Sequence, residues 1–436
     1  MFVKNSVRPA LLSVVFALAG TTAAHAYGPE GLFGGRINPD STYDVSTPIP
    51  TETAPQRGQT VLDHPRPDYD PQPISVGSFN LYPSLSLGGS YDSNIYATHD
   101  DKKSDEVLEV RPQVIANSNW SRHALSVLAQ GDFDYYNHRT GENYENALVQ
   151  AQGRIDIQQQ TWIGLRGGYQ RGIELRGSPD DAGGTSPTEF NQYSGGATLY
   201  RNAGFIGAQL DYDIRHLDYG NTPSLTGEIP TSTETRNEQV GKAKFTLDLN
   251  SNIKPYAQVA VNRRDYDNDP VRSSHGYKAD LGIDGDFGGI VLVNAYAGWL
   301  SQDYAHFGAD QTNDGLDFGG RVTWNVTGLT TLIADANRSV EEAPLSSFNS
   351  FMATGGSLTL THELRRNLLV EADASYTHDR FQGNGSQTQN YPSFGGGLRW
   401  LINQNFYTDL LYNYQERTSD TGFTRNLVTL RLNMQL

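Results

Sequence analysis

The final stretch of the sequence reads Asn426-Leu-Val-Thr-Leu-Arg-Leu-Asn-Met-Gln-Leu436, and every second residue from Val428 onward is apolar. Side chains along a β-strand point alternately to its two faces. One face therefore carries Val428, Leu430, Leu432, Met434 and Leu436, and the other carries Thr429, Arg431, Asn433 and Gln435. A strand with one apolar and one polar face is typical of a transmembrane β-barrel, which has lipid outside and water inside.

The same alternation recurs from Ser78 to Leu436, interrupted by eight short connections and nine longer polar loops, one of them at residues 382–389. This pattern predicts an all-β, antiparallel transmembrane barrel of eighteen strands, or of sixteen if one hairpin is misread. Outer-membrane barrels have short periplasmic turns and long extracellular loops. We therefore expect both ends of the barrel to be periplasmic and the long loops near residues 178–189 and 219–234 to be extracellular. Residues 329–337 alternate poorly.

Residues 1–26 have the features of a secretory signal peptide. Lys4 and Arg8 precede an apolar run at residues 10–18, which is too short to span a bilayer as a helix, and a small-x-small cleavage site follows at residues 24–26. We expect cleavage after Ala26 and, with the barrel, a location in the outer membrane of a Gram-negative cell.

Residues 27–77 differ from the rest of the chain. They contain nine prolines and show no apolar periodicity. Proline at this density blocks both helices and strand ladders. We expect a Pro-rich periplasmic leader that is largely disordered, followed by the barrel at residues 78–436. The alternatives are a docking strap for a periplasmic partner and a plug inside the lumen.

The composition excludes several classes of protein. Hydrophobic residues make up only 37% of the chain, which suits strands that need apolar side chains at alternate positions. There is no cysteine, so the chain has no disulfide framework. The formal charge is −16, and cleavage after Ala26 would remove two basic residues and bring it near −18. We therefore expect no nucleic-acid partner, because phosphate binding needs a basic surface.

Charged residues of both signs occupy the inward positions of the expected strands. A barrel of sixteen to eighteen strands leaves a water-filled channel, so these side chains would line it. The candidate lumen-facing residues are Arg111, Asp132, Asp134, Arg154, Lys242, Lys244, Tyr136 and Tyr256. The charges either pair across strands, which satisfies a polar lumen, or separate by sign into a constriction that selects solutes.

Tyrosines gather toward the ends of the expected strands. Tyrosine and tryptophan collect at membrane interfaces, because one edge of each ring is apolar and the other is wet. This pattern predicts aromatic girdles. The alternative is an inward aromatic track for sugar rings, and its candidates are Tyr82, Tyr136, Tyr256 and Tyr296.

The sequence offers no catalytic or cofactor motif, so we expect no enzyme, no cofactor and no metal site. Asp265, Asp267 and Asp269 have the spacing of a calcium loop, but Pro270 and Gly276 stand where that loop needs Gly and Glu. A weak divalent-cation site in this loop is the alternative to ordinary solvated carboxylates.

The opening strand, Pro83-Ser-Leu-Ser-Leu-Gly-Gly-Ser-Tyr-Asp-Ser-Asn-Ile-Tyr96, resembles the first strand of a family of outer-membrane β-barrel porins. Many members of that family are encoded beside exopolysaccharide or capsule synthesis genes. The resemblance implies passage of small solutes or export of polysaccharide, and it implies no catalytic residues.

Together these observations predict a porin-like channel for small solutes or for exopolysaccharide export. The alternative is a closed barrel that serves structure or surface binding without transport. The expected partners are outer-membrane lipid, the barrel assembly machinery, and polysaccharide or periplasmic export components.

Overall fold

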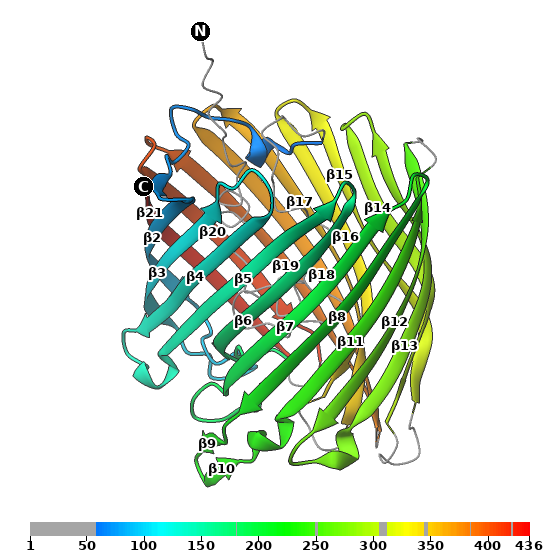
Figure 1. The fold of residues 1–436 in the computed structure, drawn as a ribbon. Helices are drawn as coiled ribbons and strands as arrows, with labels where there is room; N and C mark the ends of the chain where they lie inside the picture. The colour runs from blue at the N-terminus through cyan, green and yellow to red at the C-terminus, as the bar shows by residue number, and fades with distance from the viewer. Residues whose placement is uncertain are drawn as a thin grey trace.

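The computed structural model describes residues 58–179, 181–248, 252–304, 312–343, 348–383, 385–419 and 422–436. Within these ranges eighteen antiparallel strands form one closed barrel (Figure 1). Each wall strand pairs with its two neighbours, and the first wall strand also pairs with the last. The expected eighteen-stranded antiparallel barrel is confirmed. No helix within the described ranges has the length and apolar character needed to cross a membrane.

The wall strands are, in chain order, β2 (Phe79–Asp92), β3 (Asp105–Ser118), β4 (Ala124–Tyr136), β5 (Tyr144–Gln158), β6 (Thr161–Ile173), β7 (Glu189–Asn202), β8 (Ile206–Tyr219), β11 (Arg236–Leu247), β12 (Ile253–Tyr266), β13 (Ser274–Phe287), β14 (Val291–Asp303), β15 (Thr312–Thr327), β16 (Thr330–Glu342), β17 (Phe348–Arg365), β18 (Leu368–Gly383), β19 (Gly385–Leu401), β20 (Phe406–Arg417) and β21 (Phe423–Gln435). The smaller elements are β1 (Ile74–Val76), β9 (Thr222–Ser224), β10 (Gly227–Ile229), and the 3-10 helices η2 (Val61–Asp63), η3 (Thr140–Glu142), η4 (Thr231–Glu234) and η5 (Pro270–Arg272).

The last strand has the two faces that its sequence predicts. Leu430 is 58% exposed on the outer face, whereas its neighbour Arg431 is 8% exposed and points into the barrel. The strand closes the wall by pairing with β2, from Ser84 opposite Gln435 to Asp92 opposite Leu427. The alternation therefore separates a lipid-facing surface from a polar interior.

The eight tight turns lie at one end of the barrel, and β2 begins and β21 ends at this same end (Figure 1). The β9–β10 hairpin lies at the opposite end, which we call the long-loop end. One expected loop, at residues 382–389, is wrong. β18 continues to Gly383 and β19 starts at Gly385, with cross-strand pairs up to the turn. Alternation reports contact with lipid, so it is lost where strand ends no longer touch lipid and both faces can be polar.

Exposed aromatic side chains form a belt toward each end of the outer surface. The belt toward the long-loop end contains Tyr91, Tyr135, Tyr193, Tyr212, Tyr277, Tyr376 and Tyr412. The belt toward the tight-turn end contains Trp120, Phe205, Phe287, Trp324, Trp400 and Phe406. Such belts are the interfacial girdles expected of a membrane barrel.

The expected signal peptide and residues 27–57 of the expected leader lie outside the described residues. Residues 58–77 are described, and they make defined contacts with the barrel. They contain η2 and β1, and β1 adds a short strand against β2 with Ile74 opposite Leu81.

The orientation of the barrel can be tested at Gly183, in the connection between β6 and β7. Gly183 is exposed, and a side chain added there would meet open space. An epitope inserted before Gly183 should be labelled by antibody on intact cells, because long loops of outer-membrane barrels are extracellular. An insertion at Gly288, in the tight turn between β13 and β14, is the matched control and should be labelled only after permeabilisation. The reverse pattern would overturn the orientation.

Candidate functional site: the barrel lumen

A cluster of charged side chains on the inner faces of β3 and β4 contains three of the predicted lumen residues. The Arg111 guanidinium lies 2.6 Å from a carboxylate oxygen of Asp132 and 2.7 Å from one of Glu109. It also lies 3.6 Å from Asp134, whose other carboxylate oxygen accepts a hydrogen bond of 2.6 Å from the Tyr144 hydroxyl. The structure therefore gathers Arg111, Asp132 and Asp134 into one network.

This network continues across the seam where the barrel closes. Glu109 binds Arg431 of β21 at 2.7 Å, and the pair meets over Gly88 of the intervening strand β2. A Cβ atom at Gly88 would lie 2.8 Å from the Arg431 side chain, so the glycine leaves room for the ion pair. Further along the wall, Arg399 donates two hydrogen bonds of 2.7 and 2.8 Å to Asp409. In this region positive and negative charges pair across strands instead of separating by sign.

A second group surrounds the predicted lumen residues Lys244 and Tyr256. The Lys244 ammonium lies 3.1 Å from a carboxylate oxygen of Asp284 and 3.9 Å from the centre of the Tyr256 ring. The same ring packs over Gly282, where a Cβ atom would lie only 2.3 Å from it. Tyr256 is therefore buried between a cation and the wall, and its ring faces are occupied.

Tyr296 has a similar place two strands away from Tyr256, on β14. In register, Tyr256, Gly282, Tyr296 and Gly319 form one row across β12 to β15, and Tyr296 packs over Gly319. The other two track candidates are elsewhere: Tyr82 on β2, and Tyr136 at the end of β4. The four tyrosines of the aromatic-track hypothesis therefore do not form one continuous path.

Two further predicted lumen residues lie apart from these groups. Arg154 lies 2.8 Å from Asp156 on its own strand and 5.1 Å from the Trp162 ring centre, and Trp162 stacks on Tyr200 at 5.2 Å. Lys242 is half-buried on β11, opposite Asp211 of β8. Alternation gave no signal for the inward Trp162, because aromatic residues were expected in the outward-facing girdles.

Two inward carboxylates of β18 have no cationic partner. Glu371 accepts a hydrogen bond from the Thr361 hydroxyl at 3.2 Å, and one oxygen of Asp373 is buried without a hydrogen-bond donor in the described part of the chain. Within the described ranges, no Lys or Arg nitrogen comes within ion-pair distance of either carboxylate. Their cross-strand neighbours on β19 are Gly397 and Gly395, which have no side chain to contact them. This patch therefore carries two carboxyl groups without an ion-pair partner in the described part of the chain.

The tight-turn end of the lumen is lined by residues 58–73, which we call the strap. Gly58 lies against the Leu292 side chain of β14, and the Val61 amide donates a hydrogen bond of 2.9 Å to the Thr331 hydroxyl of β16. Further along, Gln404 donates to the Pro67 carbonyl at 2.7 Å, and Gln435 donates to the Tyr69 carbonyl at 3.1 Å. The strap thus follows the inner rim from β14 to β21 before it enters β1.

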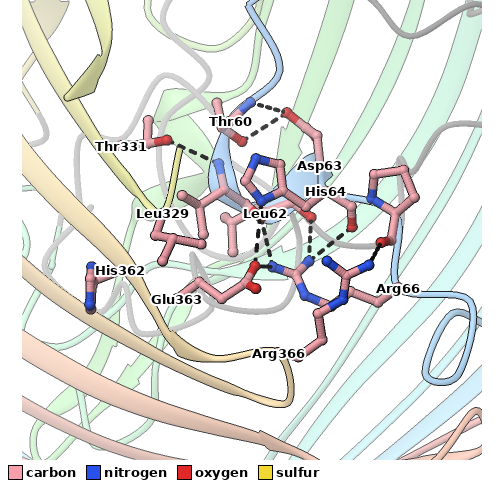
Figure 2. Close-up of polar contacts among 12 residues, drawn as sticks. Thr60, Leu62, Asp63, His64, Arg66, Leu329, Thr331, His362, Glu363 and Arg366 are labelled. Carbon is pink, nitrogen blue, oxygen red and sulfur yellow. Dashed lines mark hydrogen bonds and ion pairs between the residues drawn. The ribbon is translucent and has the colours of Figure 1, made fainter. Parts of the chain in front are cut away.

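An ion pair fixes the middle of the strap to the wall (Figure 2). An Arg66 guanidinium nitrogen lies 2.6 Å from a carboxylate oxygen of Glu363, and both side chains are buried. Arg66 also donates to the carbonyls of Val61 at 2.8 Å and His64 at 3.1 Å, which holds the strap around the guanidinium. Val61 is 1% exposed and packs against Leu369. Residues 58–73 therefore line the inside of the barrel mouth.

The connection between β6 and β7, residues 174–188, covers part of the opposite mouth. Arg176 donates hydrogen bonds of 2.8 and 2.7 Å to Glu142, in the connection between β4 and β5. Burial disfavours the charged guanidinium, but the hydrogen bond to Glu142 and the charge of Asp181 outweigh it and raise the pKa of Arg176. Gly177 packs against Ala97 and against Phe423 at the start of β21. The connection thus extends from β6 as far as the closing strand.

Two of the aspartates with calcium-loop spacing contact other side chains. Asp265 lies 2.8 Å from Arg263, and Asp267 accepts a hydrogen bond of 3.0 Å from Asn237. Of the described residues, only Asp105, Glu106 and His138 bring potential metal-ligand atoms within 4.8 Å of one another. Asp105 already accepts backbone hydrogen bonds from Glu106, His138 and Arg139, so this group has a structural role in fastening the turn after β4.

A closed antiparallel barrel with an apolar outer surface, aromatic girdles and a charged interior defines an outer-membrane barrel of the porin class. The chain belongs to the family described as "Putative beta-barrel porin 2", whose model matches residues 66–436. The family and the location in the outer membrane agree with the resemblance and the localisation expected from the sequence. The match begins at Arg66, so it includes the anchoring arginine of the strap.

Solved structures with similar folds are also outer-membrane barrels. The outer-membrane protein OpdK of Pseudomonas aeruginosa is 12% identical, with a TM-score of 0.44, over 82% of this chain and 99% of that chain. OccAB3 of Acinetobacter baumannii is 10% identical, with a TM-score of 0.46, over 83% of this chain and 100% of that chain. A search of curated proteins finds no match.

Proposed function

We propose that this barrel is a passive channel for small hydrophilic solutes with a modest preference for cations. The observation that carries the proposal is the balance of charge on the inner wall. The inward basic residues Arg111, Arg399 and Arg431 form ion pairs with carboxylates, whereas no described Lys or Arg nitrogen lies within ion-pair distance of Glu371 or Asp373. A lumen with excess carboxylate attracts cations and repels anions.

Passage of small solutes is favoured over export of a polysaccharide, which the family resemblance also implied. A polymer guide needs aromatic faces that successive sugar rings can reach. The Tyr256 ring is covered by Lys244 and by the wall at Gly282, and the remaining candidates are dispersed. Polysaccharide added to one side of a bilayer should therefore cause little block of the current.

The proposal is tested by the reversal potential of the purified full-length protein in a planar bilayer under a salt gradient. The wild-type channel should favour cations, and the Glu371→Gln/Asp373→Asn variant should lose most of that preference. The preference should also fade between 0.1 M and 1 M salt, because the Debye length falls from about 10 Å to about 3 Å.

The matched control is Glu106→Gln/Glu145→Gln, which removes the same charge from exposed residues near the outer rim. This variant should keep the wild-type preference. Equal loss of selectivity in both variants would assign the preference to the overall charge of the protein instead of the lumen.

A closed barrel without transport is the second candidate, because inward-folded segments cover parts of both mouths. The strap occupies the rim at the tight-turn end, and Arg176 fastens residues 174–188 over the other end. This candidate requires zero conductance from the wild-type protein and from a variant without residues 27–73. Ion flow in either protein excludes it.

A further inference from the structure

The barrel wall is split at the long-loop end between β15 and β16. The two strands pair from Thr327 and Thr330 up to Gly319 opposite Asn337, and beyond this point residues 312–318 and 338–342, all of them described, have no pairing with one another. β16 remains paired with β17, β17 with β18, and β18 with β19. One group of strand ends has therefore separated from the wall as a unit.

On the other side of this unit, β19 stays in register with β20 as far as Asn390, which exchanges two backbone hydrogen bonds of 3.2 and 2.8 Å with Thr418. Beyond this bridge, residues 385–389 have no pairing with the described part of β20. The strand ends of the unit are residues 338–343, 348–354, 378–383 and 385–389. We call this four-stranded unit the flap.

The flap bends into the lumen. By the alternation of faces along β16 and β17, Val340 and Met352 belong to the outward-facing side of these strands. Both nevertheless pack against Leu300 on the inner face of β14. Asn313 of β15 also points inward, and its amide donates a hydrogen bond of 3.3 Å to the Ser350 hydroxyl. These contacts place the β16–β17 side of the flap on the inner wall formed by β12 to β15.

One carboxylate fastens the flap in this position. Glu342 forms an ion pair with Arg264 of β12, and it accepts hydrogen bonds of 2.7 Å from the Tyr266 hydroxyl and 3.0 Å from the Tyr304 hydroxyl. Arg264 also donates to the Val340 carbonyl at 3.0 Å. All these side chains are buried. Removal of the Glu342 carboxylate would leave the Arg264 guanidinium buried without its partner, which is strongly destabilising.

The free edge of β15 offers the flap a second set of contacts. Continuing the β15–β16 register past Gly319 and Asn337 would set Val340 opposite Leu316, whose side chain is exposed on the outer face. Residues 312–318, which pair with β14 along one edge, would then have a strand ladder along the other edge as well. A segment with two alternative sets of contacts can act as a two-state switch.

We propose that the flap is a gate over the long-loop mouth and that Glu342 is its latch. Its gating role rests on the channel function proposed above, whereas its release from the inner wall does not. Loss of the Glu342 carboxylate frees the flap, and movement of the flap toward β15 widens the mouth.

Release of the flap is tested by the accessibility of a single cysteine at Met352, because the chain contains no other cysteine. Met352 is 2% exposed in the docked flap. With Met352→Cys in the background, Glu342→Gln should speed labelling by a water-soluble maleimide at least about tenfold, which corresponds to ~1.4 kcal/mol. Tyr304→Phe removes one donor and should give a smaller increase.

The matched control is Asp335→Asn, which removes a carboxylate from the part of β16 that remains in the wall. It should leave labelling at the wild-type rate. Heat-modifiable migration on a gel confirms that each variant has a folded barrel. A folded Glu342→Gln variant that labels as slowly as the control overturns the latch, and so does equal acceleration in both variants.

Gating is tested by single-channel recording of the same proteins without the cysteine. Glu342→Gln should raise the open probability or the conductance, whereas Asp335→Asn should not raise the open probability. Faster labelling with unchanged currents overturns the gate. Faster labelling with no current in any protein, including one without residues 27–73, supports the latch and overturns the channel function.

Discussion

Replacing Glu363 with glutamine should release the strap from the inner rim of the barrel. The substitution leaves the Arg66 guanidinium buried without its carboxylate, and removal of one partner from a buried ion pair costs about 3–5 kcal/mol. Val61→Cys provides the probe, because Val61 is buried against Leu369 and the chain has no native cysteine. Maleimide labelling at position 61 should be faster by about two orders of magnitude, which corresponds to ~2.8 kcal/mol.

The control replaces both charges, in Arg66→Met/Glu363→Met. Two apolar side chains of similar size leave no unpaired charge, and such replacements are often neutral or stabilising. The double variant should keep position 61 protected. If Glu363→Gln alone also stays protected, the ion pair does not anchor the strap. If the double variant is as exposed as the single one, the strap needs the charges themselves, and an unpaired guanidinium is not the cause of its release.

Replacing Val259 with arginine should destabilise the barrel by about 2–4 kcal/mol, which is the cost of a cation on the lipid face near the bilayer centre. Val259 is 52% exposed on the outer face and lies near the middle of β12. The measurement is reversible unfolding in urea with phospholipid vesicles, followed by tryptophan fluorescence.

The neighbouring substitution Gln258→Arg is the matched control. Gln258 points inward, and its amide donates a hydrogen bond of 3.1 Å to Asp280, so an arginine there would meet a carboxylate. Its effect should stay within about 0.5 kcal/mol, as for ordinary surface substitutions. Similar losses of stability at both positions would show that the assignment of faces on β12 is wrong.

Much of the wall could be predicted from the sequence, because the lipid imposes a local rule. Each residue of a strand such as β21 touches either lipid or lumen, so alternation identifies the strand, its faces and, with the connections, the number of strands. The cross-strand partners Arg111 and Asp132 could be expected for the same reason, since they occupy inward positions of adjacent strands. Local rules of this kind do not predict the contacts between the wall and the segments that fold into the lumen.

The strap and the flap depend on partners far apart in the sequence. Arg66 and Glu363 are 297 residues apart, and Arg264 and Glu342 are 78 residues apart. One signal was present: residues 329–337 alternate poorly, and Ile333 is an apolar residue at an inward position. Leu292 and Leu369 interrupt the polar face in the same way. An apolar side chain that faces the lumen needs a cover, so such interruptions indicate where an inward-folded segment packs.

The seam between β2 and β21 has a consequence for assembly. All other pairs of adjacent wall strands are consecutive in the chain. The pair of β2 and β21 is the exception, because it joins the first wall strand to the last, with Ser84 opposite Gln435. Until that last strand arrives, β2 and β20 are edges whose backbone amides and carbonyls have no partner on one side, and hydrocarbon offers none. The insertion intermediate is therefore an open sheet whose two edge strands need hydrogen-bond partners from elsewhere. A truncation that removes β21 would leave a sheet that cannot close into a barrel, even if its remaining strands are correctly paired.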